Sequence, residues 1–261
     1  MGQFQIACQT ITWGANQRNE FPAVFEQVKK AGYAGVEIGF RHIRETAPAE
    51  LAKMLGDQGL VLAASHVGGN LFDTQQAGQE RSMIDEVLDY LDQMGTKLLM
   101  YSGLRYNSDE QLAADVDMLN RAAEGARARG VSLLYHNHDF EFFEEGRAAD
   151  ALLHKTVEAL GWCPDIGWLM KGGAPVPEFL DKIRDRIGAV HFKDFATDGA
   201  AEERECDTVE LGEGVAPLGQ AAEWLKANKS GLWVIAEQDN AAVPAGEAAA
   251  KNAAYLKKVV G

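Results

Sequence analysis

The sequence has few cysteines and no long apolar run. Its 261 residues include Cys8, Cys163 and Cys206, which are widely spaced and form no Cys-x-x-Cys pair. This pattern indicates neither a disulfide framework nor a cysteine-ligated zinc site, so we expect reduced thiols. No apolar stretch approaches the roughly 20 residues that cross a bilayer, and no membrane association is predicted. The first residues also lack the features of a secretory signal, which predicts a cytoplasmic protein.

Positive charge is scarce as well. Lys and Arg together number 25 against 39 Asp and Glu, for a formal net charge of −14. Such a surface repels polyanions at long range and disfavours a nucleic-acid partner that needs a basic footprint. A small ligand remains compatible, because a local lysine is enough to hold one anionic group. The expected partner is therefore a small molecule.

What the chain does have is a regular alternation of short apolar runs and longer amphipathic segments. This alternation is typical of βαβ units and a parallel sheet. The runs predicted as strands are Phe4–Thr10, Gly35–Gly39, Leu60–His66, Thr96–Ser102, Val131–His136, Trp162–Asp165, Ala189–Lys193 and Leu232–Glu237. The segments predicted as helices are Phe21–Ala31, Pro48–Gln58, Glu80–Met94, Ser108–Arg129, Ala148–Leu160, Val176–Ile187, Pro217–Ala227 and Pro244–Val259.

Eight strand–helix repeats without a break in composition favour a closed barrel over an open doubly wound sheet. No Gly-x-Gly-x-x-Gly phosphate turn follows the first strand. The predicted fold is thus α/β, a single (β/α)8 barrel over residues 1–261. Long loops are expected after strands three, five and seven, at Val67–Gly78, Asp139–Arg147 and Phe195–Val215, and the last could act as a lid.

Polar side chains cluster where the predicted strands end. His136 and His138 stand at i and i+2, so on a strand both imidazoles point to the same side. The other strand ends carry Glu37, His66, Asp165, His191 with Lys193, and Glu237. Imidazoles with carboxylates suit Mn²⁺, Fe²⁺, Co²⁺ or Zn²⁺, whereas Mg²⁺ more often takes oxygen alone. Any one histidine could be structural, but the set together indicates a metal pocket.

Several of these segments carry a family resemblance. In order they are Val36-Glu37-Ile38-Gly39, Tyr135-His136-Asn137-His138, Pro164-Asp165-Ile166-Gly167-Trp168, Val190-His191-Phe192-Lys193-Asp194 and Ala236-Glu237-Gln238. Over essentially the whole chain the pattern resembles the xylose isomerase-like TIM-barrel superfamily. That superfamily includes sugar phosphate isomerases/epimerases, ketose 3-epimerases, inosose dehydratase and, more remotely, endonuclease IV.

The resemblance implies one divalent metal, Mn²⁺ or Co²⁺ first, with Zn²⁺, Fe²⁺ or Mg²⁺ as alternatives. In the epimerases a Glu on strand five, an Asp on six, a His on seven and a Glu on eight bind it. Asp165, His191 and Glu237 match the last three positions. His136 stands at the first, where this chain departs from the pattern. The ligand set implied for this chain is His136, Asp165, His191 and Glu237.

The departure on strand five bears on the reaction. The epimerases are thought to use the strand-five and strand-eight glutamates as opposed acid and base. A metal-bound histidine cannot easily be that base, because coordination occupies its lone pair. The leading hypothesis is a metal-dependent isomerase or epimerase of a sugar or sugar phosphate, acting through an enediolate. The alternative is an inosose dehydratase-like or 3-keto-glycoside lyase, which eliminates a β-substituent from a keto-polyol.

Under either hypothesis three residues are predicted to act in catalysis. Glu237 is the expected base and His138 the expected acid. Lys193, on the same face as His191, is expected to bind an oxyanion or hydroxyl of the substrate. Its alternative role is an ion pair with Asp194 or Glu237.

The remaining candidates are predicted to bind substrate. Glu37 and His66 would hold hydroxyls, with a structural hydrogen bond as the alternative. Trp168 would stack on a sugar ring or simply pack. Glu141 would bind substrate, orient one of the histidines or be solvated. By resemblance we expect a homodimer. A non-catalytic sugar-binding barrel and an endonuclease IV-like phosphodiesterase are the remaining alternatives, and the net charge argues against the second.

Overall fold

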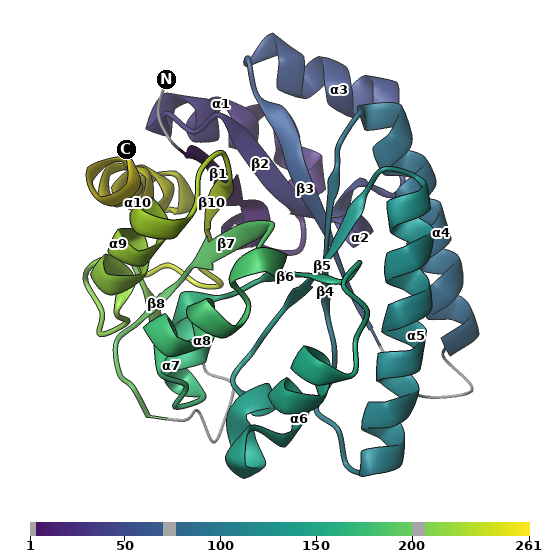
Figure 1. Ribbon diagram of the computed structural model, residues 1–261. Helices are drawn as coiled ribbons and strands as arrows, with labels where there is room; N and C mark the ends of the chain where they lie inside the picture. Colours follow the sequence, from purple (N-terminus) through teal and green to yellow (C-terminus); the bar gives the residue numbers. More distant parts are fainter. Residues whose placement is uncertain (1–3, 70–76, 200–206) are drawn as a thin grey trace.

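The chain forms a barrel of parallel strands surrounded by helices (Figure 1). The computed structural model describes residues 4–69, 77–199 and 207–261. The barrel strands are β1 (Gln5–Gln9), β2 (Gly35–Gly39), β3 (Val61–Gly68), β4 (Leu98–Ser102), β5 (Ser132–His136), β6 (Gly161–Cys163), β7 (Ala189–Phe192) and β10 (Trp233–Ala236). They pair in the order β6-β5-β4-β3-β2-β1-β10-β7.

The two end strands of this sheet meet. Single parallel bridges join Trp162 to Ile187 and Asp165 to His191, next to β6 and β7, so the barrel is nearly closed. The predicted α/β barrel is therefore confirmed, and each of its eight strands overlaps a predicted one. Parallel strands of a closed barrel all end at the same rim, which brings together side chains that are far apart in the sequence.

The helices fill the connections between strands. They are α1 (Phe21–Ala31), α2 (Phe40–Ile43), α3 (Pro48–Asp57), α4 (Ala77–Met94), α5 (Asp109–Ala128), α6 (Phe143–His154), α7 (Ile166–Lys171), α8 (Val176–Lys182), α9 (Leu218–Asn228) and α10 (Ala245–Val260). In Figure 1 α4 and α5 lie side by side, and α10 lies beside α1. Among the described residues, no helix combines the length and apolar character needed to cross a membrane.

Helix ends follow local chemistry. Ser108 precedes α5, and its hydroxyl accepts the backbone N–H of Gln111 at 3.3 Å, as expected of an N-cap. Gly32 ends α1 at a φ of 92°, a left-handed conformation that glycine adopts without a Cβ clash. Its N–H bonds the carbonyl of Lys29 at 2.9 Å. These signals make the ends of α1 and α5 readable from sequence.

The inside of the barrel is packed with side chains. Its residues are mostly small: Ala7, Ala63, Ala64, Met100, Leu134, Cys163, Ala189 and Ile235. Leu134 uses the space left by two glycines, since a Cβ on Gly161 would lie 2.4 Å from its side chain and one on Gly188 would lie 2.7 Å away. The barrel is therefore a filled core, and ligands must bind at its ends.

Two predicted loops contain regular structure. Within Phe195–Val215, the pair β8 (Asp194–Phe195) and β9 (Thr208–Val209) forms an antiparallel ribbon. Asp194 anchors this region, because its carboxylate accepts the backbone N–H groups of Gly212, Gly214 and Ala216. Such contacts span about 20 residues and leave no periodic signal in the sequence. The predicted lid falls partly outside the described residues.

The loop expected after strand five is also ordered. Its residues form the 3-10 turn η3 (Phe140–Phe142) and the first turn of α6, which begins earlier than predicted. Within that turn Glu144, Glu145 and Gly146 have positive φ, so the chain bends sharply before the regular helix. The loop expected after strand three is replaced in part by the last residues of β3 and in part lies outside the described residues.

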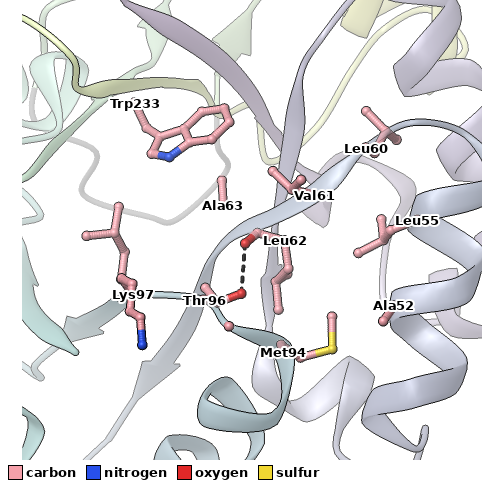
Figure 2. Close-up of a pocket in the computed structure, with 12 residues that line it drawn as sticks. Ala52, Leu55, Leu60, Val61, Leu62, Ala63, Met94, Thr96, Lys97 and Trp233 are labelled. Carbon is pink, nitrogen blue, oxygen red and sulfur yellow. Dashed lines mark hydrogen bonds between the residues drawn. The ribbon is translucent and has the colours of Figure 1, made fainter. Parts of the chain in front are cut away.

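The end of the barrel where the strands begin is lined mainly by apolar side chains. A pocket of about 430 Å³ lies there (Figure 2), at the first residues of β3, β4 and β10. Its walls include Leu55, Leu62 and Trp233, and Thr96 Oγ1 donates to the carbonyl of Leu62 at 2.9 Å. Among the residues that the structure describes, neither a carboxylate nor an imidazole lines this pocket, and Lys97 is the one charged residue there. Titratable groups gather instead at the opposite end.

Candidate metal centre

Four side chains converge where the strands end. His136 is the last residue of β5, Asp165 follows β6, His191 lies in β7 and Glu237 follows β10. One ligand atom from each lies within 4.8 Å of all the others, and all four residues are buried. These are the four residues predicted to bind metal. The barrel rim brings them together although about 100 residues separate His136 from Glu237 in the sequence.

The two nitrogens and two oxygens fit a cation. His136 Nε2 lies 3.4 Å from both Asp165 Oδ2 and Glu237 Oε2. Within the described residues, neither His136 Nε2 nor Asp165 Oδ2 forms a hydrogen bond. A buried polar atom without a partner is costly, and a divalent cation between these atoms would satisfy both. Asp165 Oδ1 has a separate task, because it caps α7 by accepting the Trp168 N–H at 2.8 Å.

The far sides of the two histidines are joined by a chain of hydrogen bonds. His136 Nδ1 lies 3.2 Å from Ser102 Oγ, which lies 2.9 Å from His66 Nε2. His66 Nδ1 lies 3.3 Å from Glu37 Oε1, and Glu37 Oε2 lies 2.8 Å from His191 Nε2. Three side chains thus connect the two candidate ligand histidines.

Burial and neighbouring charges shift the pKa values of several groups around the centre. Burial would raise the pKa of Glu237, but Lys193 and His191 hold it well below the usual range. Burial would likewise raise the pKa of Glu37, yet the charge of His191 and the hydrogen bonds of His191 and His66 bring it to about 2. Burial lowers the pKa of His66. Both glutamates are therefore ionised at neutral pH and His66 is neutral. Burial would lower the pKa of His191, but neighbouring negative charges, Glu37 and Glu237 among them, hold it well above its usual value.

A cavity of about 420 Å³ opens beside the centre. Small-molecule sites commonly have volumes of about 300–1,000 Å³, so a sugar-sized ligand fits this space. Its lining residues are Gln9, Ile11, Gly39, Phe40, Arg41, His66, Val67, Gly68, Met83, Ser102, His136, His138, Glu237 and Asp239. The lining contains both polar and apolar side chains, which can contact the hydroxyl groups and the C–H bonds of a polyol.

His138 lines the cavity without joining the metal cluster. Its ring stacks on Phe140 with centroids 5.4 Å apart and lies 5.6 Å from the ring of Trp168. Burial first, and then the charges of His136 and Lys193, hold the pKa of His138 well below its usual value. The ring is therefore neutral at pH 7. To serve as the predicted acid, it must first accept a proton.

Lys193 is held in a buried cage of anions. Its Nζ donates to Glu237 Oε1 at 3.0 Å and to Asp239 Oδ2 at 2.9 Å, and it lies 5.0 Å from the centre of the Trp168 ring. The ion pair with Glu237, which the sequence left as an alternative, is the arrangement found. Asp194 instead binds backbone N–H groups. Trp168 packs against Lys193 and His138, and it does not line the cavity.

Glu37 and Glu141 were predicted to bind substrate, but both are fully buried and neither lines the cavity. Glu37 bonds His66 and His191. Glu141 accepts the hydroxyl of Tyr135 and the backbone N–H of His138, each at 2.9 Å. For Glu37 these contacts fit the alternative of a structural hydrogen bond. For Glu141 they fit the alternative of orienting a histidine. His66 does reach the cavity, where it is partly exposed.

Some cavity residues were missed from sequence. Ser102 ends β4 and Asp239 follows Glu237 at i+2, so both repeat the strand-end pattern that identified the histidines. Serine at a strand end carries no metal signal by itself, which is why Ser102 was overlooked. Arg41 lies in α2, directly after β2, and only the fold places it at the cavity.

Comparison with known proteins agrees with this geometry. A family model described as "Xylose isomerase-like TIM barrel" matches residues 25–259. The chain belongs to this family. It is 25% identical over 275 residues to a protein named inosose dehydratase from Clostridium beijerinckii, covering 94% of this chain and 91% of that one. Relatives with this name are enzymes.

Two solved structures share the fold. One is a sugar phosphate isomerase/epimerase from Parabacteroides distasonis, with a TM-score of 0.82 and 20% identity over 100% of this chain and 96% of that one. The other is the IOLI protein, described with a bound zinc atom, with a TM-score of 0.82 and 17% identity over 98% of each chain. At these identities the likeness establishes the barrel.

Proposed function

We propose that the protein is a divalent-metal-dependent enzyme that removes the α-proton of a keto-sugar or keto-polyol. The observation that carries this proposal is the convergence of four buried ligand groups beside a cavity that His138 also lines. Two imidazoles with two carboxylates favour Mn²⁺ or Co²⁺, with Fe²⁺ and Zn²⁺ close to them and Mg²⁺ less suited. The zinc described for the IOLI protein supports a transition metal at such a site.

The bound cation would act as a Lewis acid toward the substrate carbonyl and its neighbouring hydroxyl, lowering the pKa of the α-proton. Side chains of the cavity would transfer the protons. Glu237 and His138 both line the cavity, one as an ionised carboxylate and the other as a neutral imidazole, so either can accept a proton. Lys193 does not line the cavity, and its ammonium donates to Glu237 Oε1 at 3.0 Å, which keeps that carboxylate ionised beside the cavity.

Two reactions can follow removal of the α-proton. Isomerisation or epimerisation returns a proton to a carbon atom, and the fold likeness to a sugar phosphate isomerase/epimerase is compatible with it. Elimination expels a β-substituent, and His138 protonated in the first step would donate to the departing oxygen. One feature of this chain favours elimination. His136 occupies the strand-five position, so the site lacks the second glutamate of the epimerases, and the relative named inosose dehydratase supports the same choice.

Solvent deuterium distinguishes the two reactions. Metal-loaded protein is incubated in D2O with ketohexoses, inososes and 3-keto-glycosides, and products are read by NMR and mass spectrometry. Deuterium at a retained carbon without loss of mass indicates isomerisation, whereas loss of water or an alcohol indicates elimination. If loaded protein exchanges no α-proton of any of these ketones, the proposed enolisation is wrong.

Metal should also stabilise the fold measurably. A cation that binds only the folded chain adds about 2.7 kcal/mol at 100 times its dissociation constant. For a chain of this size, that corresponds to a rise in Tm of roughly 5–10 °C. Scanning calorimetry of chelator-treated protein, with and without added Mn²⁺ or Co²⁺, measures the rise. An unchanged Tm with every transition metal tested would contradict the metal centre.

A further inference from the structure

We infer that Glu37 sets the protonation pattern of both candidate ligand histidines, so that each turns a lone pair toward the metal centre. Glu37 is then a positioning residue that acts through His191 on one side and through His66 and Ser102 on the other. The inference rests on the proposed metal centre and goes further, because it explains why three side chains outside the ligand set are joined in one chain of hydrogen bonds.

The argument begins with the carboxylate, which can only accept hydrogen bonds. Glu37 Oε2 lies 2.8 Å from His191 Nε2, so that nitrogen must carry the proton. His191 Nδ1 faces Glu237 Oε2 and donates to it when no cation is bound, so a cation bound there would replace the proton on Nδ1 while Nε2 keeps its own. A proton on Nε2 held by a carboxylate is the usual way in which a protein orients a metal-binding histidine.

A second series of hydrogen bonds runs from Glu37 through His66 and Ser102 to His136, and its donors and acceptors are equally defined. His66 Nδ1 lies 3.3 Å from Glu37 Oε1 and must also donate, so a neutral His66 has its lone pair on Nε2. The Ser102 hydroxyl, 2.9 Å away, therefore donates to His66. Its oxygen is left to accept from His136 Nδ1 at 3.2 Å. The lone pair of His136 then lies on Nε2, the buried atom 3.4 Å from Asp165 and Glu237.

An amide in place of the carboxylate breaks this pattern. In Glu37→Gln the side chain can accept from one histidine but must present N–H groups to the other. If the amide faces His66, the chain reverses and a proton is placed on His136 Nε2. If it faces His191, Nε2 must accept, and the proton of a neutral His191 is then held on Nδ1, toward Glu237. In both orientations one ligand nitrogen carries a proton toward the metal, although size and shape are conserved.

We expect Glu37→Gln to bind Mn²⁺ or Co²⁺ about 10–100-fold more weakly, as measured by titration against a competing chelator. Glu141→Gln is the matched control, because Glu141 is an equally buried glutamate whose hydrogen bonds go to the Tyr135 hydroxyl and the backbone of His138. Its metal affinity should equal that of the wild type. Ser102→Ala cuts only the His136 branch and should give a smaller loss than Glu37→Gln, which provides a second variant if Glu37→Gln fails to fold.

Nitrogen NMR of ¹⁵N-histidine-labelled, metal-free protein at mildly alkaline pH reads the protonation pattern directly. The wild type should show His136 protonated on Nδ1 and His191 on Nε2. In Glu37→Gln one of the two should switch, whereas a merely structural role of Glu37 would leave both unchanged. If the wild type binds metal and Glu37→Gln binds it equally well with the same tautomers, the inference is wrong. If the wild type binds no metal, the proposed function fails, while the tautomers still test the hydrogen-bond order.

Discussion

Replacing Asp165 with asparagine is expected to abolish metal binding at working concentrations and activity with it. Asp165 Oδ2 is buried, bonds nothing among the described residues and faces His136 Nε2. An asparagine would turn an amide or a neutral oxygen toward the cation and remove one of two close negative charges. Loss of a residue that hydrogen-bonds a metal ligand typically weakens metal binding about 10–100-fold. Loss of a direct ligand should weaken it by at least the upper end of that range. Chelator competition and metal analysis of the purified variant measure it.

This substitution separates the metal from the fold. The amide oxygen can still accept the Trp168 N–H, so the cap of α7 and the metal-free stability should change little. Asp115→Asn is the matched control, since Asp115 is a buried carboxyl on α5 that accepts the hydroxyl of Tyr106 and lies outside the cluster. That control should bind metal normally. An Asp165→Asn variant that retains metal and turnover would refute the assigned centre.

The second large effect is expected at His138. His138→Gln should leave metal affinity intact, because His138 lies outside the four-ligand cluster, yet kcat should fall by about 10²–10⁴-fold, the usual contribution of a positioned acid or base. The pKa of His138 is held low by burial, so the variant should also lose a limb of the pH–rate profile on the acid side, where the ring takes up a proton. Steady-state kinetics across pH, with metal content measured in parallel, tests both statements.

His136→Gln provides the converse of this experiment. His136 Nε2 belongs to the cluster, so this variant should lose metal affinity as well as activity. Two histidines two residues apart would then be assigned to different tasks by one pair of measurements. Equal metal loss in both variants would place His138 among the ligands and remove it as the proton-transfer group.

The barrel was predictable because it rests on periodic signals. Apolar strands and amphipathic helices alternate along the chain, and residues such as Ser108 and Gly32 mark helix ends through local chemistry. The ribbon of β8 and β9 was not predictable, since it pairs two strands of only two residues each, and the Asp194 carboxylate binds N–H groups about 20 residues away. Sequence periodicity reports a segment's own pattern and says nothing of a partner so far along the chain.

The location of the candidate site was also predictable from the sequence. A strand end is visible in sequence, and parallel strands share one rim, so polar residues at several strand ends point to one site. The sequence did not show which of these side chains are buried. Glu37 and Glu141 look like cavity residues in the sequence, but the structure encloses both and gives them neighbouring side chains and backbone to hold.

The sequence by itself determined the α/β barrel and the ligand types at its rim, because periodicity and strand-end position are properties of short segments. Only the tertiary structure decided which groups touch. The link from Glu37 through His66 and Ser102 to His136 joins four strands, and the cage of Lys193 is made by two carboxylates that follow a fifth, β10. Hydrogen-bond direction and burial arise from distances between strands, and these exist only once the barrel has formed.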